Sequence, residues 1–420
     1  MTSAIDEPAV LISHPTGNQN VRNAVQSLAE HNMLAEFWTA IAWQPESRWN
    51  PLLPDKLKML LARRTFQEAP RDQVKSVPWR EMVRLGARSS PFGKLLTAGE
   101  RPFSVVGMYR NFDAKVAQRL RELEADAVYA YEGGALQTFR EARRQGIAAL
   151  YELTTGHWNW KRNRLREEAE CNPESAGLLS QLNDSARHLD EKSEELQLAD
   201  LVFVPSQHVR RTLAGVVPDE KIRVLCYGAP QVRERNRIRQ PASRPLKVLF
   251  AGALSRQKGI GYLLDAIDLL DSRVELTLVG RRLGADRRVD EACNKWRWFE
   301  TIPHRQVLEV MMESDVLVLP SFSEGFGLVV TEALACGVPV IVTPEVGASD
   351  LVSDGREGFV VPVGSGADIA DRLSALDRDR ELLAQMSQNA QITAAAHTWE
   401  NYRRTFAETV AETVRTSSWR

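Results

Sequence analysis

Short apolar runs alternate with segments of helical spacing throughout the second half of the chain, and no other feature restricts the fold as strongly. The apolar runs are rich in Val, Ile and Leu, as strands buried on both faces are. Parallel neighbours need a long crossover connection, so this order predicts a parallel sheet covered by helices, a Rossmann-like domain. We expect strands at Leu246 to Phe250, Glu275 to Val279, Glu300 to Ile302, Val316 to Leu319, Val338 to Val342 and Gly358 to Val361, and helices at Gly259 to Leu270, Gln306 to Met312, after Gly327 and at Asp368 to Leu376.

The first half shows the same alternation with two long interruptions. The stretches 44–102 and 158–199 break the pattern, and structureless loops of that length are uncommon, so we expect added helices in both. The expected strands are Val10 to Ser13, Phe37 to Ile41, Val105 to Met108, Ala127 to Tyr131, Ala148 to Leu153, Leu201 to Val204 and Ile222 to Leu225, with helices at Asn20 to Glu30, Ala135 to Gln145 and Ser206 to Leu213.

The length of the chain and one stretch rich in Arg, Gln and Pro suggest how it is divided. A chain of 420 residues exceeds one hydrophobic core. We expect a first Rossmann-like domain over 1–228, a linker over 229–245 and a second Rossmann-like domain over 246–397. Residues 398–420 carry aromatic and aliphatic side chains at helical spacing, which predicts a helix that packs back on the first domain. The predicted fold is α/β, with two doubly wound domains facing each other across a cleft.

Composition excludes several classes of protein. The 54 Lys and Arg nearly balance the 55 Asp and Glu, which gives no indication of a nucleic-acid partner. Four cysteines without C-x-x-C spacing are typical of reduced thiols. The first eight residues carry acids instead of a basic flank, and no apolar run approaches the roughly 20 residues of a spanning helix. We therefore expect a cytoplasmic protein.

The stretch 51–100 is the one strongly basic part of the chain. It holds ten Lys or Arg against five acids, interleaved with apolar residues. Two interpretations remain open: a peripheral contact with an anionic membrane surface, or a solvated helical face.

Two glutamates flank a glycine-rich turn between an expected buried strand and an expected helix. Glu324 and Glu332 stand at either end of the segment Gly325-Phe326-Gly327-Leu328 and its helix, at most about 12 Å apart along the axis. Glycines allow an anion to approach closely, and the amides at a helix start attract it. The pattern predicts a bound diphosphate, with one carboxylate facing a sugar and the other a ribose. The alternative is two solvated helix charges.

A second turn offers positive charge. The segment Gly252 to Gly259 joins the first strand of the second domain to its helix and contains Arg256 and Lys258. Arg forks onto phosphate oxygens and Lys supplies a point charge, so the turn suits a diphosphate. The glycines lack the G-x-G-x-x-G spacing of a dinucleotide site.

Two loops of the first domain are expected at the cleft, because ligands bind outside the carboxyl ends of parallel strands. One contains Gly17 and Asn18, with Asn20 as a candidate helix N-cap. The other contains His157, which suits hydrogen bonding to a sugar hydroxyl or a proton relay, beside Trp158. A structural histidine is the alternative.

We expect no metal site. The seven histidines are dispersed, and the only D-x-D, Asp377-Arg378-Asp379, lies in a charged run instead of after a strand.

Taken together, these residues resemble a known family. The run from Ala251 to Ser365 is similar to the donor domain of family 4 glycosyltransferases of the GT-B architecture. The resemblance rests on Gly252 to Gly259, Val279-Gly280, Pro303 with its following helix, Leu319-Pro320-Ser321, the Glu324 and Glu332 pair, Gly337 to Ile341, Gly347 and Gly358-Phe359-Val360. The first domain matches only loosely.

The resemblance implies roles for these positions. Glu324 would contact the donor sugar, the amides of Gly325 to Leu328 the sugar and phosphate, and Glu332 the ribose. Arg256 and Lys258 would neutralise the leaving diphosphate, and His157 would lie near the reacting carbon. The family transfers sugars without a metal or other cofactor and with retention of configuration. Many members carry Arg where this chain has Ala253, which puts the leaving-group charge in question.

The sequence thus predicts a hexosyltransferase-like enzyme that moves a sugar from a nucleotide-diphosphate sugar to a hydroxyl acceptor, namely a glycan, a lipid-linked sugar or a small molecule. A sugar phosphorylase or epimerase of the same architecture, or a catalytically weak nucleotide-sugar-binding protein, are the alternatives. The donor base, the donor sugar, the acceptor and the oligomeric state leave no signal in the sequence.

Overall fold

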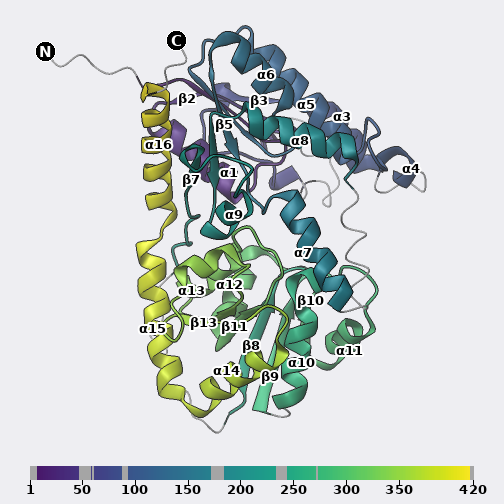
Figure 1. Cartoon of the computed structure of the whole chain (residues 1–420), viewed down its shortest axis with the longest axis vertical. Coiled ribbons are helices and arrows are strands. Elements are labelled where there is room, and N and C mark those ends of the chain that lie inside the picture. The colour runs from purple at the N-terminus through teal and green to yellow at the C-terminus, as the bar shows by residue number, and fades with distance from the viewer. Residues whose placement is uncertain are drawn as a thin grey trace, which may run out of the picture.

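The computed structural model describes residues 7–46, 58, 61–87, 93–171, 184–232, 244–270 and 273–416 (Figure 1). It contains two parallel sheets, each flanked by helices, in two halves of the molecule. The predicted α/β fold with two Rossmann-like domains is confirmed. Parts of the predicted linker and of the basic stretch 51–100 lie outside the described residues.

The first sheet has seven parallel strands in the order β3-β2-β1-β4-β5-β6-β7. Its inner strands are buried on both faces, which explains their continuous apolar runs. The strands are β1 (Val10–Ser13), β2 (Leu34–Thr39), β3 (Val74–Ser76), β4 (Ala127–Tyr131), β5 (Ala148–Glu152), β6 (Leu201–Val204) and β7 (Ile222–Val224).

Three local expectations for the first domain are wrong. The strand expected at Phe37 to Ile41 begins three residues earlier, at Leu34, and ends at Thr39. Val105 to Met108 is not a strand but the first turn of a helix, α5, because the Ser104 hydroxyl accepts the Gly107 amide as an N-cap. Asn20 is not the cap of the first helix, α1, which begins one residue after Asn18. The helices of this domain are α1 (Gln19–Glu30), α3 (Pro78–Ala87), α4 (Gly93–Thr97), α5 (Val105–Leu120), α6 (Leu136–Gln145), α7 (Trp158–Cys171), α8 (Ala186–Leu198) and α9 (Gln207–Thr212).

The second sheet has six parallel strands in the order β10-β9-β8-β11-β12-β13. They are β8 (Leu246–Ala251), β9 (Val274–Val279), β10 (Arg297–Phe299), β11 (Val316–Leu319), β12 (Val340–Val342) and β13 (Gly358–Val360). The strand expected at Glu300 to Ile302 is wrong by three residues, because the edge strand β10 consists of a half-exposed Arg-Trp-Phe run that does not resemble a buried strand.

Helices cover both faces of the second sheet, and a final helix crosses to the first. They are the single-turn η5 (Arg256–Lys258), then α10 (Ile260–Leu270), α11 (Arg287–Lys295), α12 (His304–Glu313), α13 (Leu328–Ala335), η7 (Gly347–Leu351), α14 (Gly366–Arg378), α15 (Arg380–Ala396) and α16 (Trp399–Thr416). Among the described residues, no helix has both the length and the apolar character needed to cross a membrane.

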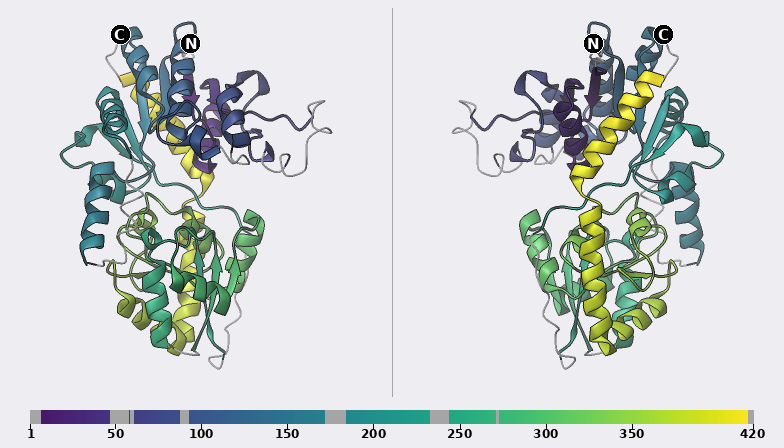
Figure 2. Two further views of the ribbon diagram at one scale, coloured as in Figure 1. Left: turned by 90° about the vertical axis from the view of Figure 1, so that its right-hand side faces the viewer. Right: turned by 90° about the vertical axis from the view of Figure 1, so that its left-hand side faces the viewer.

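The last helix returns to the first domain. α16 runs up beside α1, where the Ser27 hydroxyl contacts the Arg403 carbonyl and Arg403 pairs with Glu30 (Figure 2). The chain leaves and re-enters this domain at one place, since the Ala229 amide donates to the His397 carbonyl at 2.7 Å. The two domains are therefore joined by two adjacent chain segments.

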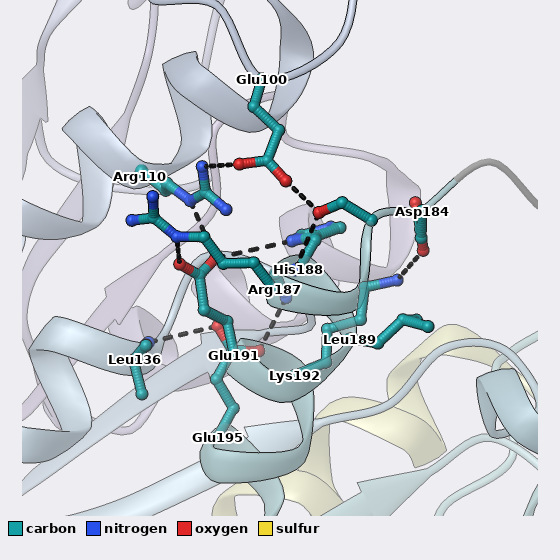
Figure 3. Close-up of polar contacts among 12 residues, drawn as sticks. Glu100, Arg110, Leu136, Asp184, Arg187, His188, Leu189, Glu191, Lys192 and Glu195 are labelled. Carbon is teal, nitrogen blue, oxygen red and sulfur yellow. Dashed lines mark hydrogen bonds and ion pairs between the residues drawn. The ribbon is translucent and has the colours of Figure 1, made fainter.

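The start of α6 is held by buried carboxylates from other helices. Glu195 of α8 accepts the amides of Gly133, Ala135 and Leu136 at 2.8–3.2 Å (Figure 3). Burial raises the pKa of the Glu195 carboxyl to about 7. These bonds fix the loop after β4 at the carboxyl edge of the first sheet.

Candidate active site

The carboxyl edges of the two sheets meet, and glycine makes this contact possible. The Ser206 hydroxyl of the first domain donates to the Gly325 carbonyl at 2.7 Å. A Cβ added to Gly325 would lie 1.9 Å from the carbonyl oxygen of Thr154, which follows β5. Because glycine has no side chain, the loop after β11 can lie directly against the first domain at this position.

Further interdomain contacts surround this point. The start of α9 meets the loop after β12, where the Gln207 amide donates to Asp350 at 2.6 Å and the His208 imidazole lies 3.0 Å from the Glu345 carboxylate. The Tyr262 hydroxyl of α10 donates to Glu168 of α7 at 2.9 Å. The site is thus framed by both domains.

The glycine-rich turn forms the start of α13 as the sequence suggests. Gly327 is the N-terminal cap, with a left-handed φ of 88° that a residue with a side chain adopts only at a cost. Phe326 points inward and packs on Tyr227 with ring centroids 5.1 Å apart. The first amides of α13 therefore lie beside the interdomain contact, where the positive end of the helix dipole favours an anion.

Lys258 and Glu324 meet in this gap. The Lys258 ammonium forms an ion pair with the Glu324 carboxylate. Gly259, at φ 73°, packs its backbone against Pro320 and so brings the turn after β8 to the loop after β11. Burial lowers the pKa of Lys258 to about 8, and the charge of Lys161 from the first domain adds to this effect.

Arg256 lies in the same turn but has another partner. Its Nε is 3.1 Å from Asp286, the residue that caps α11. The structure brings Lys258 into contact with Glu324. The assignment of Arg256 to a diphosphate stays a prediction.

Glu332 lies on α13 and is nearly buried. One carboxylate oxygen is 2.8 Å from Nε2 of His304, at the start of α12. This bond raises the pKa of the half-exposed His304. The sequence analysis identified Pro303 and its helix but missed His304, because the two residues are 28 positions apart and form no local motif.

His157 follows β5 and is buried. Its Nδ1 accepts the Asn159 amide at 3.3 Å, which leaves the proton on Nε2, and its ring lies 4.0 Å from that of Trp158. Burial and the charge of Lys192 lower the pKa of His157 to about 4. A neutral imidazole with this tautomer presents a hydrogen-bond donor at Nε2.

The loop after β1 is shaped by a histidine that the sequence analysis did not single out. Nδ1 of His14 accepts the Gly17 amide at 2.9 Å, and burial lowers the pKa of His14 to about 3. Gly17 has φ 65°, and an added Cβ would lie 2.3 Å from the Phe66 ring. Asn18 is exposed, and Asn20 instead donates to Glu152 and to Tyr227 inside the domain.

No cluster of three or more metal-ligating side chains occurs among the described residues.

Comparisons with known proteins point to one family for the second domain. Residues 232–393 match the model of "Glycosyl transferases group 1". A D-inositol 3-phosphate glycosyltransferase of Arthrobacter sp. (strain FB24) is 34% identical over 180 residues, which are 40% of this chain and 42% of that protein. One of Corynebacterium urealyticum is 28% identical over 258 residues, 57% of this chain and 60% of that protein. The chain spans less than half the length of the first of these relatives.

Solved structures resemble the whole chain. A sucrose-phosphate synthase from Thermosynechococcus elongatus aligns over 98% of this chain and 100% of its own, with a TM-score of 0.68 and 18% identity. HepE from Anabaena, in complex with UDP, aligns over 96% and 100%, with a TM-score of 0.64 and 18% identity. At this identity, the likeness establishes the shared two-domain fold.

Proposed function

Because residues 232–393 match the model of the glycosyl transferases of group 1 and the chain has the GT-B architecture, we propose that the protein is a glycosyltransferase. It moves a sugar from a nucleotide-diphosphate sugar to a hydroxyl acceptor, with retention of configuration and without a metal. The observation that carries this proposal is the pair of Lys258 and Glu324 beside the glycine contact between the domains.

Lys258 is suited to the diphosphate of a nucleotide-sugar donor, and Glu324 is suited to its sugar. The ammonium of Lys258 and the first amides of α13 stabilise the negative charge that develops on the leaving diphosphate. The Glu324 carboxylate accepts hydrogen bonds from sugar hydroxyls once the donor takes its place beside Lys258. Glu332, oriented by His304, accepts from the ribose hydroxyls.

The transfer breaks the bond between the anomeric carbon and the diphosphate oxygen, and the electron pair leaves with the diphosphate. The acceptor oxygen bonds to the same carbon on the same face, and its proton passes to the departing phosphate oxygen. His157 donates from Nε2 to a sugar hydroxyl near that carbon and takes no proton, which its lowered pKa favours.

The first test is a thermal-shift screen of nucleoside diphosphates and their sugars, because a ligand of the folded state raises the melting temperature. UDP is the first probe, since HepE was solved with UDP. Phosphorylated polyols belong in the acceptor panel, given the names of the relatives. Glu324→Ala and Lys258→Ala are each expected to lose at least 100-fold in transfer while the melting temperature without ligand stays unchanged. Full transfer by both variants would refute the proposal.

Two alternatives have distinct outcomes in the same assay. Epimerisation of the donor without acceptor, or cleavage that needs phosphate, identifies an epimerase or a phosphorylase. Ala253 motivates a binding protein instead, and nucleotide binding without turnover across a broad donor panel supports it.

Metal independence and membrane contact are tested separately. Transfer is expected to continue after dialysis against EDTA. Sedimentation with anionic vesicles at low salt tests the peripheral contact proposed for the stretch 51–100.

A further inference from the structure

A pocket of about 140 Å³ lies at the carboxyl edge of the first sheet, next to His157. Its wall comes from the end of β4, the loop after β5, α7 and the start of α8. The charged and polar residues of this wall are Glu132, Thr155, Lys161, Arg162, Asp184 and Lys192. None of them was singled out by the sequence analysis.

One lysine engages both carboxylates of the pocket. Nζ of Lys192 lies 3.1 Å from Glu132 and 2.8 Å from Asp184. Figure 3 shows Lys192 and Asp184 paired beside the first turn of α8. Lys192 therefore contacts both carboxylates of the wall but balances only one of their two charges.

Two further cations line the wall, which gives it three positive charges against two negative ones. Within the part of the chain that the structure describes, the side chains of Lys161 and Arg162 have no ion pair or hydrogen bond. Lys161 is partly buried, and this burial lowers its pKa, whereas the charges of Glu132 and Asp184 act in the opposite direction. Because the wall keeps a surplus of one positive charge and a partly desolvated cation is stabilised by an anion, the pocket is suited to a negatively charged group.

The pocket adjoins the donor loop. Thr155 belongs to its wall, and the backbone of Thr155 lies 2.9 Å from the place where a Cβ of Gly325 would be. Trp158, also in the wall, packs on His157. A molecule held here presents its far end to the gap that contains His157, Lys258 and Glu324.

We propose that this pocket, which we name the Lys161 pocket, binds the acceptor through a phosphate or carboxylate held by Lys161 and Arg162. The acceptor is then an anionic sugar or polyol instead of a neutral one, with a hydroxyl directed at the anomeric carbon. This inference rests on the proposed function and defines its acceptor class. An anionic group can belong to a soluble molecule or to a lipid headgroup, and the chemistry at the two cations is the same.

The test compares a charged and a neutral probe of one shape. Glucose 6-phosphate and glucose are titrated calorimetrically into the full chain, with and without saturating UDP. We expect glucose 6-phosphate to bind at least about 10-fold more tightly than glucose, because each charge-assisted contact is strong. Lys161→Gln and Arg162→Gln should each remove most of that preference. Arg166→Gln, on an exposed position of α7, should not change it.

A parallel arm uses vesicles with and without phosphatidylinositol. Binding that depends on the lipid phosphate and on Lys161, without binding of glucose 6-phosphate, supports the lipid source of the same chemistry. The inference is overturned if neither phosphate probe binds, if glucose binds as well as glucose 6-phosphate, or if both glutamine variants bind like the wild type. It is also overturned if Lys161→Gln weakens UDP more than glucose 6-phosphate, because Lys161 then serves the donor.

Failure of the proposed function looks different. In that case no nucleotide binds and no sugar is transferred, while the affinity for glucose 6-phosphate still reports on the Lys161 pocket.

Discussion

The two sheets share the order of six strands, to which the first sheet adds a seventh, but the two domains shape their loops and pockets by different means. In the second domain, glycines at special backbone positions shape the loops, as at Gly259, Gly325 and Gly327. In the first domain, side chains of α7 and α8, within the stretch that interrupts the alternation, line the Lys161 pocket together with Glu132 and the loop after β5. A site built on backbone constraints leaves a motif in the sequence, whereas one built on helical side chains leaves almost none.

The largest expected effect tests the second domain, where glycine backbone positions shape the loops. Gly325→Ala places a Cβ where the Thr154 carbonyl oxygen lies, so the loop must withdraw from the first domain. We expect transfer to fall about 100-fold, because a displacement near 1 Å at the reacting groups has that effect. Steady-state kinetics measure the loss.

Gly261→Ala is the matched control. An added Cβ at Gly261 meets nothing within 4 Å, and Ala favours the helix α10. Transfer should be unchanged, with a gain in stability of about 0.5–1 kcal/mol. Equal activities of the two alanine variants would contradict the importance of the close contact.

The second prediction concerns the first domain, where side chains hold the loops in place. Glu195 has a folded-state pKa of about 7, above the value of an exposed carboxyl. Between pH 5 and 7, the folded protein keeps a proton that the unfolded chain loses, so the free energy of unfolding falls by about 2 kcal/mol as pH rises. Glu195→Gln should remove this slope in denaturant titrations, while Glu194→Gln, at an exposed ion pair, should retain it. Identical slopes in the two variants would exclude Glu195 as the source.

The third prediction uses the lowered pKa of Lys258 in the second domain. Lys258 is charged below about pH 8 and loses its charge above it. The affinity for a nucleoside diphosphate should fall about 10-fold for each pH unit above 8, until the charge is gone. Lys258→Arg should abolish this decline, because a guanidinium stays protonated. A decline that persists in the arginine variant would show that another group titrates.

The smallest effect is expected where α16 joins the two halves. Arg403→Ala removes a pair with Glu30 and a bond to Asn23, both partly exposed. We expect a loss of about 0.5–1 kcal/mol in unfolding free energy, measured with urea. Arg404→Ala, which removes only an exposed bond to Asn401, should lose less. A loss of several kcal/mol for Arg403→Ala would mean that this contact determines domain docking.

The same contrast explains how far the sequence could be interpreted. Buried parallel strands such as β8 and β11 carry continuous apolar runs and were predicted correctly. The edge strand β10 was misplaced because its residues are half-exposed. α5 was taken for a strand because Val105, Val106 and Met108 are apolar and the Ser104 cap was overlooked.

At the site, local spacing was informative and distant pairing was not. The turn from Glu324 to Leu328 was identified because its glycines and its helix start lie within a few residues. The partners His304 and Glu332, or Thr154 and Gly325, come from separate elements and become neighbours only in the fold. The roles proposed for Arg256, Lys258, Glu324, Glu332 and His157 remain predictions.

The paired crossing of the chain at Ala229 and His397 has a consequence for engineering. Because α16 packs against α1, the second domain is an insertion within the first domain. Two neighbouring chain segments, at Ala229 and His397, connect the two domains (Figure 2). Because the two connections lie at one place, they permit rotation of one domain relative to the other but little sliding. Both ends of the inserted domain therefore lie at one place, so a homologous segment could replace residues 230–396 without a change in the rest of the first domain.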